Sequence, residues 1–245
     1  MEELCIPLPS DISARFIDRP NRFVVVAELE DGKMEKAHLH DPGRLGEILR
    51  PRSRLLLKRA GREGRKTAFD VVAGGVGDRW VLINSSYHRR IAEAVLNDPE
   101  TSPFGAIQSL KAEVAVGRSR LDFRIVDDRG DAIFMEVKGC SLTIDGRALF
   151  PDAPTERGKR HIQELKGLLE EGYRAAVMIL VLGPPPGCFA PFEERDPGFA
   201  AAFRDGLEAG LEVYPLLFEY DRDLLVHKGE VPLCSEWRII AGEPP

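Results

Sequence analysis

The sequence has few cysteines and no long apolar run. Its four cysteines, Cys5, Cys140, Cys188 and Cys234, lie far apart and form no C-x-x-C pair. We therefore expect no structural zinc site and interpret them as buried free thiols in a reducing compartment. No apolar run approaches the length of a membrane span, and the acidic start of the chain, interrupted by prolines, does not resemble a signal peptide. These features predict a cytoplasmic protein without a membrane partner.

Aromatic residues are also scarce, at 7% of the chain. The candidates for stacking on nucleic-acid bases are Phe23, Phe69, Trp80 and Tyr87, and most of them are better interpreted as core residues. Charge is more informative, because residues 44–66 carry nine basic and two acidic side chains, a local charge of +7 in a chain with a net charge of −6. Such a segment is typical of a surface that follows a phosphate backbone. The competing interpretation is a solvated arginine-rich face.

The first third of the chain predicts a small β-barrel. A chain of 245 residues holds one large or two modest domains, and five short β-rich runs between residues 23 and 83, separated by turn residues, fit an OB-like barrel. We place a nucleic-acid-binding domain at residues 1–83. Asp41 and Pro42 are expected to begin a short helix that continues to Leu49. The basic side chains expected to contact a nucleic-acid backbone are Arg50, Arg52, Arg54, Arg62, Arg65 and Lys66.

Three carboxylates follow one another on consecutive predicted strands. A two-residue turn at Gly117 pairs Val116 with Ser119 and therefore aligns Glu113 with Asp122. A five-residue loop centred on Arg129 then aligns Asp122 with Glu136. Like charges placed opposite one another destabilise a sheet, so an offsetting cation is expected.

A divalent cation would fill that role, because Mg²⁺ binds one or two carboxylates together with waters and a substrate phosphate. Lys138, two residues beyond Glu136, points to the same face of its strand. Carboxylates for a metal beside a fixed ammonium are suited to phosphodiester hydrolysis. The competing interpretation is a plain polar strand face, which half-exposed strands commonly carry.

The elements around this row indicate a mixed α/β domain at residues 84–245. A helix is expected from Tyr87 to Leu96, and Thr155 is expected to cap another that ends near Gly172. The apolar run 175–182 predicts a central strand, and 211–220, which contains a proline, predicts an edge strand. The order strand, strand, strand, helix, strand, with a central mixed sheet flanked by helices, resembles the PD-(D/E)XK restriction-endonuclease-like fold. The spacing of Asp122 and Glu136-x-Lys138 resembles the signature of that superfamily.

A closer resemblance covers nearly the whole chain. The segments that carry it are His38–Leu45, Ser109–Val114, Arg118–Phe123, Glu136–Gly139 and Phe150–Gly158, followed by His161. In this order they resemble the sugar fermentation stimulation protein A (SfsA) family. The resemblance implies an amino-terminal OB-like barrel, a carboxy-terminal nuclease-like domain and DNA binding. It also favours a functional role for Glu156, Arg157 and His161, which we expect to contact nucleic acid near the scissile bond.

These observations lead to one main hypothesis and two alternatives. The main hypothesis is a nucleic-acid-binding protein, with DNA favoured over RNA, that carries an Mg²⁺- or Mn²⁺-dependent nuclease site. Asp122, Glu136 and Glu113 would bind the metal, and Lys138 would position the attacking water or stabilise charge at phosphorus. The first alternative is a DNA-binding regulator of sugar-metabolism genes with an inert nuclease-like domain. The second is an interaction module whose arginine-rich segment binds a protein or an anionic metabolite.

Overall fold

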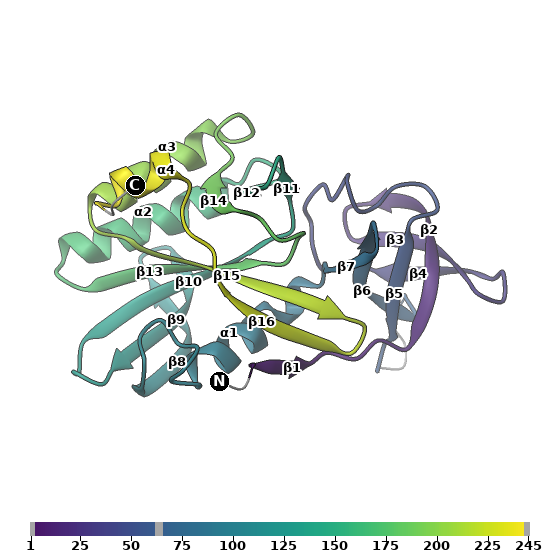
Figure 1. The fold of residues 1–245 in the computed structure, drawn as a ribbon, viewed down its shortest axis with the longest axis horizontal. Helices are drawn as coiled ribbons and strands as arrows, with labels where there is room; N and C mark the ends of the chain where they lie inside the picture. The colour runs from purple at the N-terminus through teal and green to yellow at the C-terminus, as the bar shows by residue number, and fades with distance from the viewer. Residues whose placement is uncertain (1–2, 62–65, 243–245) are drawn as a thin grey trace.

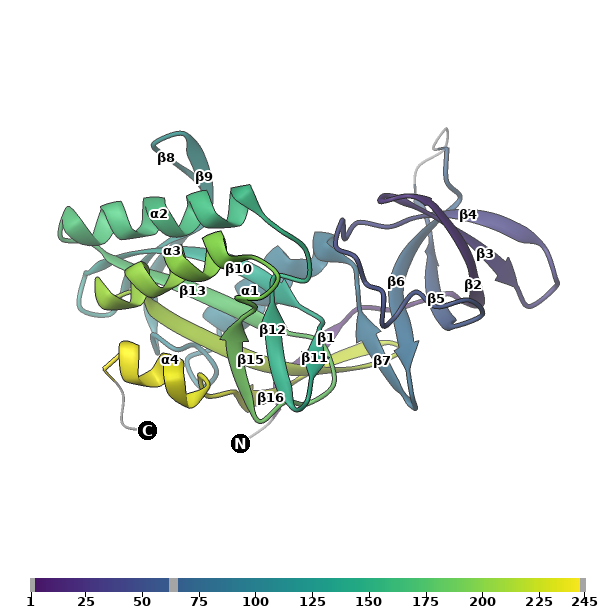
Figure 2. The same ribbon diagram turned by 90° about the horizontal axis from the view of Figure 1, so that it is seen from above.

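The structure, a computed structural model, describes residues 3–61 and 66–242. A β-barrel and a larger α/β part lie side by side (Figures 1 and 2). Two of the arginines predicted to contact nucleic acid, Arg62 and Arg65, lie outside the described residues. No helix among the described residues is long and apolar enough to cross a membrane.

Five strands close the barrel. They are β2 (Ile12–Asn21), β3 (Val24–Leu29), β4 (Met34–His38), β5 (Arg54–Arg59) and β6 (Phe69–Val76). Their order is β4-β3-β2-β5-β6, and a parallel pairing of β4 with β6 completes the ring. Apolar side chains of alternate residues, such as Ala14, Phe16, Val25 and Ala27, fill the interior, as the period of two in a strand requires. The predicted OB-like barrel is confirmed.

Three details of the barrel differ from the sequence-based prediction. β2 was missed, because bulges after Phe16 and Asp18 interrupt the alternation that identifies a strand. The short strand β7 (Arg79–Leu82), predicted as a barrel strand, instead leads from β6 to the α/β part through a Trp80–Tyr220 bridge to β15. The helix predicted at residues 42–49 is wrong: Leu45 has a φ of 50°, and a left-handed residue is incompatible with a continuing α-helix.

The α/β part is built on a mixed sheet with the order β7-β15-β13-β10-β9-β8. Its further strands are β8 (Ile107–Val116), β9 (Ser119–Asp127), β10 (Ala132–Cys140), β13 (Arg174–Val181) and β15 (Glu212–Asp221). β10, β13 and β15 run parallel, whereas β8 and β9 form an antiparallel hairpin at one edge. The sheet is thus the central mixed sheet that the sequence predicted.

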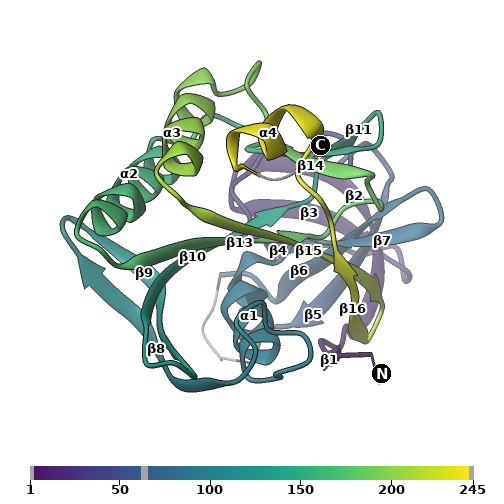
Figure 3. The ribbon, with the colours of Figure 1, turned by 60° about the vertical axis from the view of Figure 1, so that its left-hand side comes forward.

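Helices cover both faces of this sheet (Figure 3). α1 (His88–Leu96) packs on one face, and α2 (Glu156–Glu170) and α3 (Pro197–Glu208) pack on the other. Strand β13 supplies both cores in alternation, since Met178 and Leu180 contact the α1 side while Val177 and Ile179 contact the α2 side. A strand buried on both faces is continuously apolar, which explains why the run 175–182 was predicted correctly.

Smaller elements complete the fold. They are β1 (Cys5–Pro7), the 3₁₀ turn η1 (Ser85–Tyr87), β11 (Thr143–Ile144), β12 (Arg147–Phe150), β14 (Cys188–Pro191), β16 (Leu224–Glu230) and α4 (Ser235–Ile240). β11, β12 and β14 form a separate three-stranded sheet, and β1 pairs with β16. β1 therefore ties the start of the chain to a carboxy-terminal strand.

Two predictions in this part are wrong. β15 is an interior strand, since it pairs with β13 on one side and with β16 on the other. Its Pro215 is tolerated because the pairing with β16 begins only at Leu216. Cys188 and Cys234 form a disulfide that joins β14 to the start of α4, so they are not free thiols. Of the other two cysteines, both free, Cys140 is buried and Cys5 is exposed.

Candidate active site

The register of strands β8, β9 and β10 brings Asp122 next to Glu136. Val116 pairs with Ser119, and Phe123 pairs with Met135, as the two turns predicted. Immediately beyond that last pair, the carboxylate of Asp122 accepts a hydrogen bond from the backbone N–H of Val137 at 2.7 Å. The side chain of Asp122 is thereby fixed against the strand that carries Glu136.

A second group of side chains converges on Glu136. Its Oε1 accepts hydrogen bonds from Lys138 Nζ and from His161 Nδ1, each at 2.5 Å. His161 reaches this position from the first turns of α2, and its Nε2 accepts a hydrogen bond from Arg157 Nε at 3.3 Å. Glu136 is 3% exposed and His161 only 1%. A buried charge of this kind is tolerated where it is paired and hydrogen-bonded.

One oxygen of the cluster has no partner. Glu136 Oε2 is buried and accepts no hydrogen bond within the part of the chain that the structure describes. A buried carboxylate oxygen without a partner is costly. It marks the point where a ligand would complete the site.

The two carboxyl groups have opposite pKa shifts. Burial, together with the negative charge of Glu136, raises the pKa of Asp122 to about 6. Burial also acts to raise the pKa of Glu136, but the hydrogen bond from His161 and the charge of Lys138 outweigh it and lower that pKa below its usual value. Near neutral pH Glu136 is charged, whereas Asp122 lies close to its titration point, because burial and the charge of Glu136 outweigh the charge of Lys138 there.

A histidine that the sequence did not single out lies beside this cluster. The ring of His88, at the start of α1, packs against Gly139, where a Cβ would approach His88 Cε1 to 2.3 Å. Burial and the charge of Lys138 lower the pKa of His88 to about 4. Only a glycine at position 139 allows this neutral ring to lie so close to the strand.

The cluster opens into a groove between the barrel and the α/β part. The groove has a volume of about 1240 Å³, and Asp122, Glu136 and Lys138 line it. Its lining arginines come from both parts of the molecule and are Arg19, Arg22, Arg44, Arg89 and Arg157. We refer to it as the active-site groove.

A backbone contact joins the two walls of the active-site groove. Asp152, in the loop before α2, accepts a hydrogen bond from the backbone N–H of Leu45 in the barrel at 3.2 Å. Gly43 lies so close that a Cβ there would be 2.5 Å from the Asp152 carboxylate. Residues 41–45 therefore fold against the loop that leads into α2.

Comparison with known proteins identifies the family. The model of the sugar fermentation stimulation protein RE domain matches residues 86–223, and the model of the SfsA N-terminal OB domain matches residues 17–83. A homologue of sugar fermentation stimulation protein from Methanococcoides burtonii is 44% identical over 239 residues, 96% of each chain. The chain belongs to the SfsA family.

Other members agree with this assignment. A homologue from Methanothermobacter thermautotrophicus is 42% identical over 214 residues, covering 87% of this chain and 88% of its own length. The structure of Pyrococcus furiosus SfsA, solved in complex with Ca²⁺, is 27% identical with a TM-score of 0.85, and the match covers 96% of this chain and 100% of that one. The match to this solved relative therefore covers both the barrel and the α/β part of this SfsA-family chain.

Glu113 does not join the carboxylate pair in this SfsA-family chain. It has a φ of 55° within β8, is 56% exposed, and forms ion pairs with Arg89 and Arg120, both at 3.3 Å. The expected row of three carboxylates is therefore a pair, Asp122 and Glu136. Within residues 3–61 and 66–242 no group of three or more His, Cys, Asp or Glu side chains is arranged to hold a metal ion.

Four of the residues predicted to contact nucleic acid line one of two grooves, and the other described ones line neither. Glu156 and Arg157 line the active-site groove, whereas His161 is buried against Glu136. Arg52 and Arg54 line a different groove on the barrel, and neither Arg50 nor the exposed Lys66 lines either groove. The sequence analysis did not identify Arg19 and Arg22, which lie in and directly after β2, because it did not predict that strand. A prediction of β2 would have indicated them.

The donor set fits a hard divalent cation. The unpartnered Oε2 of Glu136 and the nearby carboxyl group of Asp122, with its raised pKa, are oxygen donors of the type that Mg²⁺, Mn²⁺ and Ca²⁺ prefer. A cation beside them would satisfy the buried oxygen and favour ionised Asp122.

Proposed function

We propose that this SfsA-family chain is a nuclease that depends on Mg²⁺ or Mn²⁺ and acts on DNA in preference to RNA. The observation that carries the proposal is the pair Asp122 and Glu136, which has a buried unpartnered oxygen and lies beside Lys138 in a groove lined by arginines. The Ca²⁺ complex of the Pyrococcus furiosus relative supports binding of a hard cation in this family. In this proposal residues 1–83 bind nucleic acid, residues 84–245 cleave it, and the protein acts in the cytoplasm.

Each side chain has a distinct role in this proposal. Asp122 and Glu136 hold the cation, which when bound acidifies a water molecule and neutralises phosphate charge. Lys138 Nζ, fixed on Glu136, orients the attacking water or stabilises charge at phosphorus. His161 and Arg157 hold Glu136 in place from α2. Glu113, ion-paired with Arg89, positions this arginine in the groove.

The test is cleavage of labelled single- and double-stranded DNA and RNA with several divalent metals. We expect cleavage with Mg²⁺ or Mn²⁺ and none with Ca²⁺. The Asp122→Ala variant should lose about 100-fold or more of the cleavage rate while retaining its affinity for DNA. The matched control is Asp128→Ala, which removes an exposed carboxylate from the turn that follows the same strand.

A second measurement does not depend on activity. Mn²⁺ should raise the melting temperature of the wild type more than that of Asp122→Ala, because a ligand that binds only the folded state stabilises it.

Three results would count against the proposal. Cleavage that persists in Asp122→Ala contradicts the assigned site. DNA binding without nicking under any metal supports the inert DNA-binding regulator instead. The absence of salt-dependent binding to DNA supports the interaction module.

A further inference from the structure

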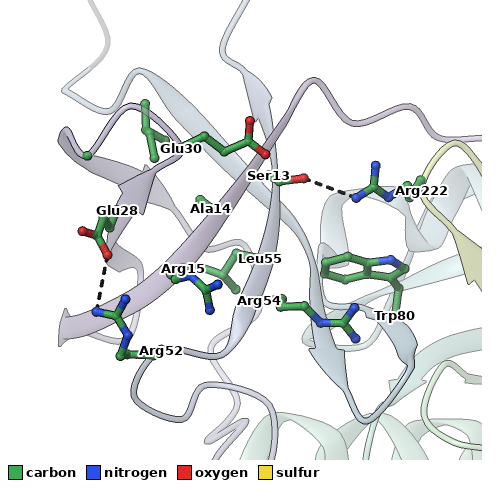
Figure 4. Close-up of a pocket in the computed structure, with 12 residues that line it drawn as sticks. Ser13, Ala14, Arg15, Glu28, Glu30, Arg52, Arg54, Leu55, Trp80 and Arg222 are labelled. Atoms are coloured by element: carbon green, nitrogen blue, oxygen red, sulfur yellow. Dashed lines mark hydrogen bonds and ion pairs between the residues drawn. The ribbon is translucent and has the colours of Figure 1, made fainter.

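A second groove lies on the outside of the barrel, and we refer to it as the barrel groove (Figure 4). It has a volume of about 520 Å³ and is formed by β2, the end of β3, the start of β5, Trp80 of β7 and Arg222 in the turn between β15 and β16. None of its lining residues lines the active-site groove. Its charged lining residues are Arg15, Arg52, Arg54, Arg222, Glu28 and Glu30.

Two arginines are held against Trp80 in this groove. The guanidinium of Arg54 lies 4.7 Å from the centre of the indole ring and that of Arg222 lies 6.0 Å from it. Figure 4 shows Trp80 between them. Arg54 also donates to the carbonyl of Gly77 at 2.5 Å, and Arg222 donates to Ser13 Oγ at 3.4 Å. Both guanidinium groups are thus positioned before any ligand binds, which reduces the entropy lost on binding.

A glycine in β6, the strand between β5 and β7, makes this arrangement possible. Gly75 of β6 pairs with Trp80 of β7, and a Cβ at position 75 would lie 2.9 Å from Arg54 Nε. Because Gly75 has no side chain, Arg54 crosses β6 and reaches the indole ring on the next strand. The contact therefore depends on three neighbouring strands of the fold.

The charge of the barrel groove is only partly balanced. Its lining carries four arginines and two glutamates in a chain with a net charge of −6. Glu28 pairs with Arg52 at 3.5 Å, but among the described residues no carboxylate forms an ion pair with Arg15, Arg54 or Arg222. A guanidinium with free N–H groups is suited to phosphate oxygens.

We propose that the barrel groove binds the phosphate groups of a nucleic-acid strand, with Arg15, Arg54 and Arg222 as the contacts. The inference rests on the proposed function for its ligand but concerns a separate surface. OB-folds typically bind oligonucleotides on the face of their second and third strands, which here are β3 and β4. The barrel groove lies on β2, the end of β3 and the start of β5, together with Trp80, and none of its lining residues belongs to β4. Contacts to phosphates bind without reading sequence.

The first test measures affinity for a DNA oligonucleotide in the full chain carrying Asp122→Ala, so that cleavage does not interfere. In this background Arg54→Ala and Arg222→Ala should each weaken binding about tenfold and each reduce the slope of log affinity against log salt by about 1. Arg15→Ala should act in the same direction, and it breaks no hydrogen bond or ion pair within the described residues. The matched control is Arg129→Ala, an exposed arginine that lines neither groove.

The second test uses the fluorescence of Trp80. The chain has two tryptophans, and Trp237 is 3% exposed in the core beside α3, so Trp237→Phe leaves Trp80 as the only reporter. Titration with the oligonucleotide should change its emission, with half-saturation at the dissociation constant measured in the first test. This change should be lost in Arg54→Ala/Arg222→Ala. A mononucleotide at equal phosphate concentration should not reproduce it.

Three results would overturn the inference: affinity and salt slope unchanged in all three arginine variants, Trp80 emission unchanged on saturation with DNA, or the same emission change produced by a mononucleotide at equal phosphate concentration. Failure of the nuclease proposal is distinguishable. An absence of cleavage in the wild type overturns the catalytic site, while a salt slope that depends on the three arginines still supports the barrel groove.

Discussion

Asp122 and Glu136 carry the same functional group on neighbouring strands, yet their surroundings shift their pKa values in opposite directions. Glu136 accepts hydrogen bonds from the ammonium group of Lys138 and the imidazole of His161, whereas Asp122 accepts one from the backbone N–H of Val137. Burial and the charge of Glu136 therefore dominate at Asp122. Two carboxyl groups whose environments separate their pKa values are typical of functional sites.

The raised pKa of Asp122 predicts a pH-dependent loss of stability. Its pKa is about 6 in the folded state, whereas the ordinary value of 3.8 applies to the unfolded chain. Between these two pH values the folded state binds more protons than the unfolded state, so the free energy of unfolding falls as pH rises. Asp122→Asn keeps an oxygen acceptor for Val137 and removes the charge. We expect it to be more stable than the wild type at pH 7.5, by at most about 3 kcal/mol, and equally stable near pH 3.5.

Urea unfolding at the two pH values, without added metal, measures this difference. Asp128→Asn, on the exposed turn after β9, should match the wild type at both. A stability difference for Asp122→Asn that is the same at pH 3.5 and pH 7.5 would contradict the assigned pKa.

Not every residue of the site was predictable from the sequence. Turn lengths fix the strand register, and so Asp122 and Glu136 were placed correctly. The left-handed φ of Glu113 leaves no signal in a residue pattern, and it removed Glu113 from the expected row. His161 was expected on a phosphate, but it is buried on Glu136. Helical spacing shows that Arg157 and His161 share a face without showing what that face contacts.

At the scale of elements, the start of α2 holds the site together. Thr155 caps this helix by accepting a hydrogen bond from Gly158 N–H at 3.0 Å. The backbone N–H of Thr155 donates in turn to Asp196 at 2.7 Å, and Asp196 caps α3 through Phe199. The orientation of α2 determines where His161 meets Glu136, so this cap contributes to both stability and the site.

Removal of the cap should therefore have two effects. Thr155→Ala should lower the free energy of unfolding by about 1 kcal/mol and reduce cleavage, because His161 loses its fixed position. Thr155→Ser keeps the hydroxyl and should restore both properties. Chemical denaturation and the cleavage assay measure them on the same samples. A Thr155→Ala protein with wild-type stability would show that the hydroxyl does not cap α2.

Elements were predictable where local chemistry determines them. The cap of α2 at Thr155, the helix α1 and the apolar strand β13 have strong local patterns. β2 was missed because its bulges interrupt the alternation. β15 is interior because it pairs with the distant β13 as well as with the adjacent β16, and the Cys188–Cys234 disulfide joins residues 46 positions apart. A local pattern contains neither of these long-range contacts.

At the scale of the whole molecule, the active-site groove exists because the barrel and the α/β part hold each other at several points. β7 continues the barrel sheet toward β15, and Ser85 Oγ donates to the carbonyl of His40 at 2.8 Å. The contact between Asp152 and the backbone of Leu45 adds the barrel loop to the wall of the groove. The sequence predicted two parts but not this junction, because the contact arises only when both have folded.

This junction gives a prediction that separates function from stability. In Gly43→Ala the new Cβ displaces the Asp152 carboxylate, which would otherwise lie 2.5 Å away, and the hydrogen bond from Leu45 is lost. We expect cleavage to fall about tenfold, since small misplacements of a substrate-binding wall reduce rates strongly, with little change in melting temperature. Gly46→Ala lies in the same loop with no atom within 4 Å of the new Cβ and should cleave like the wild type. Equal activity of the two variants would show that the barrel loop is not part of the catalytic groove.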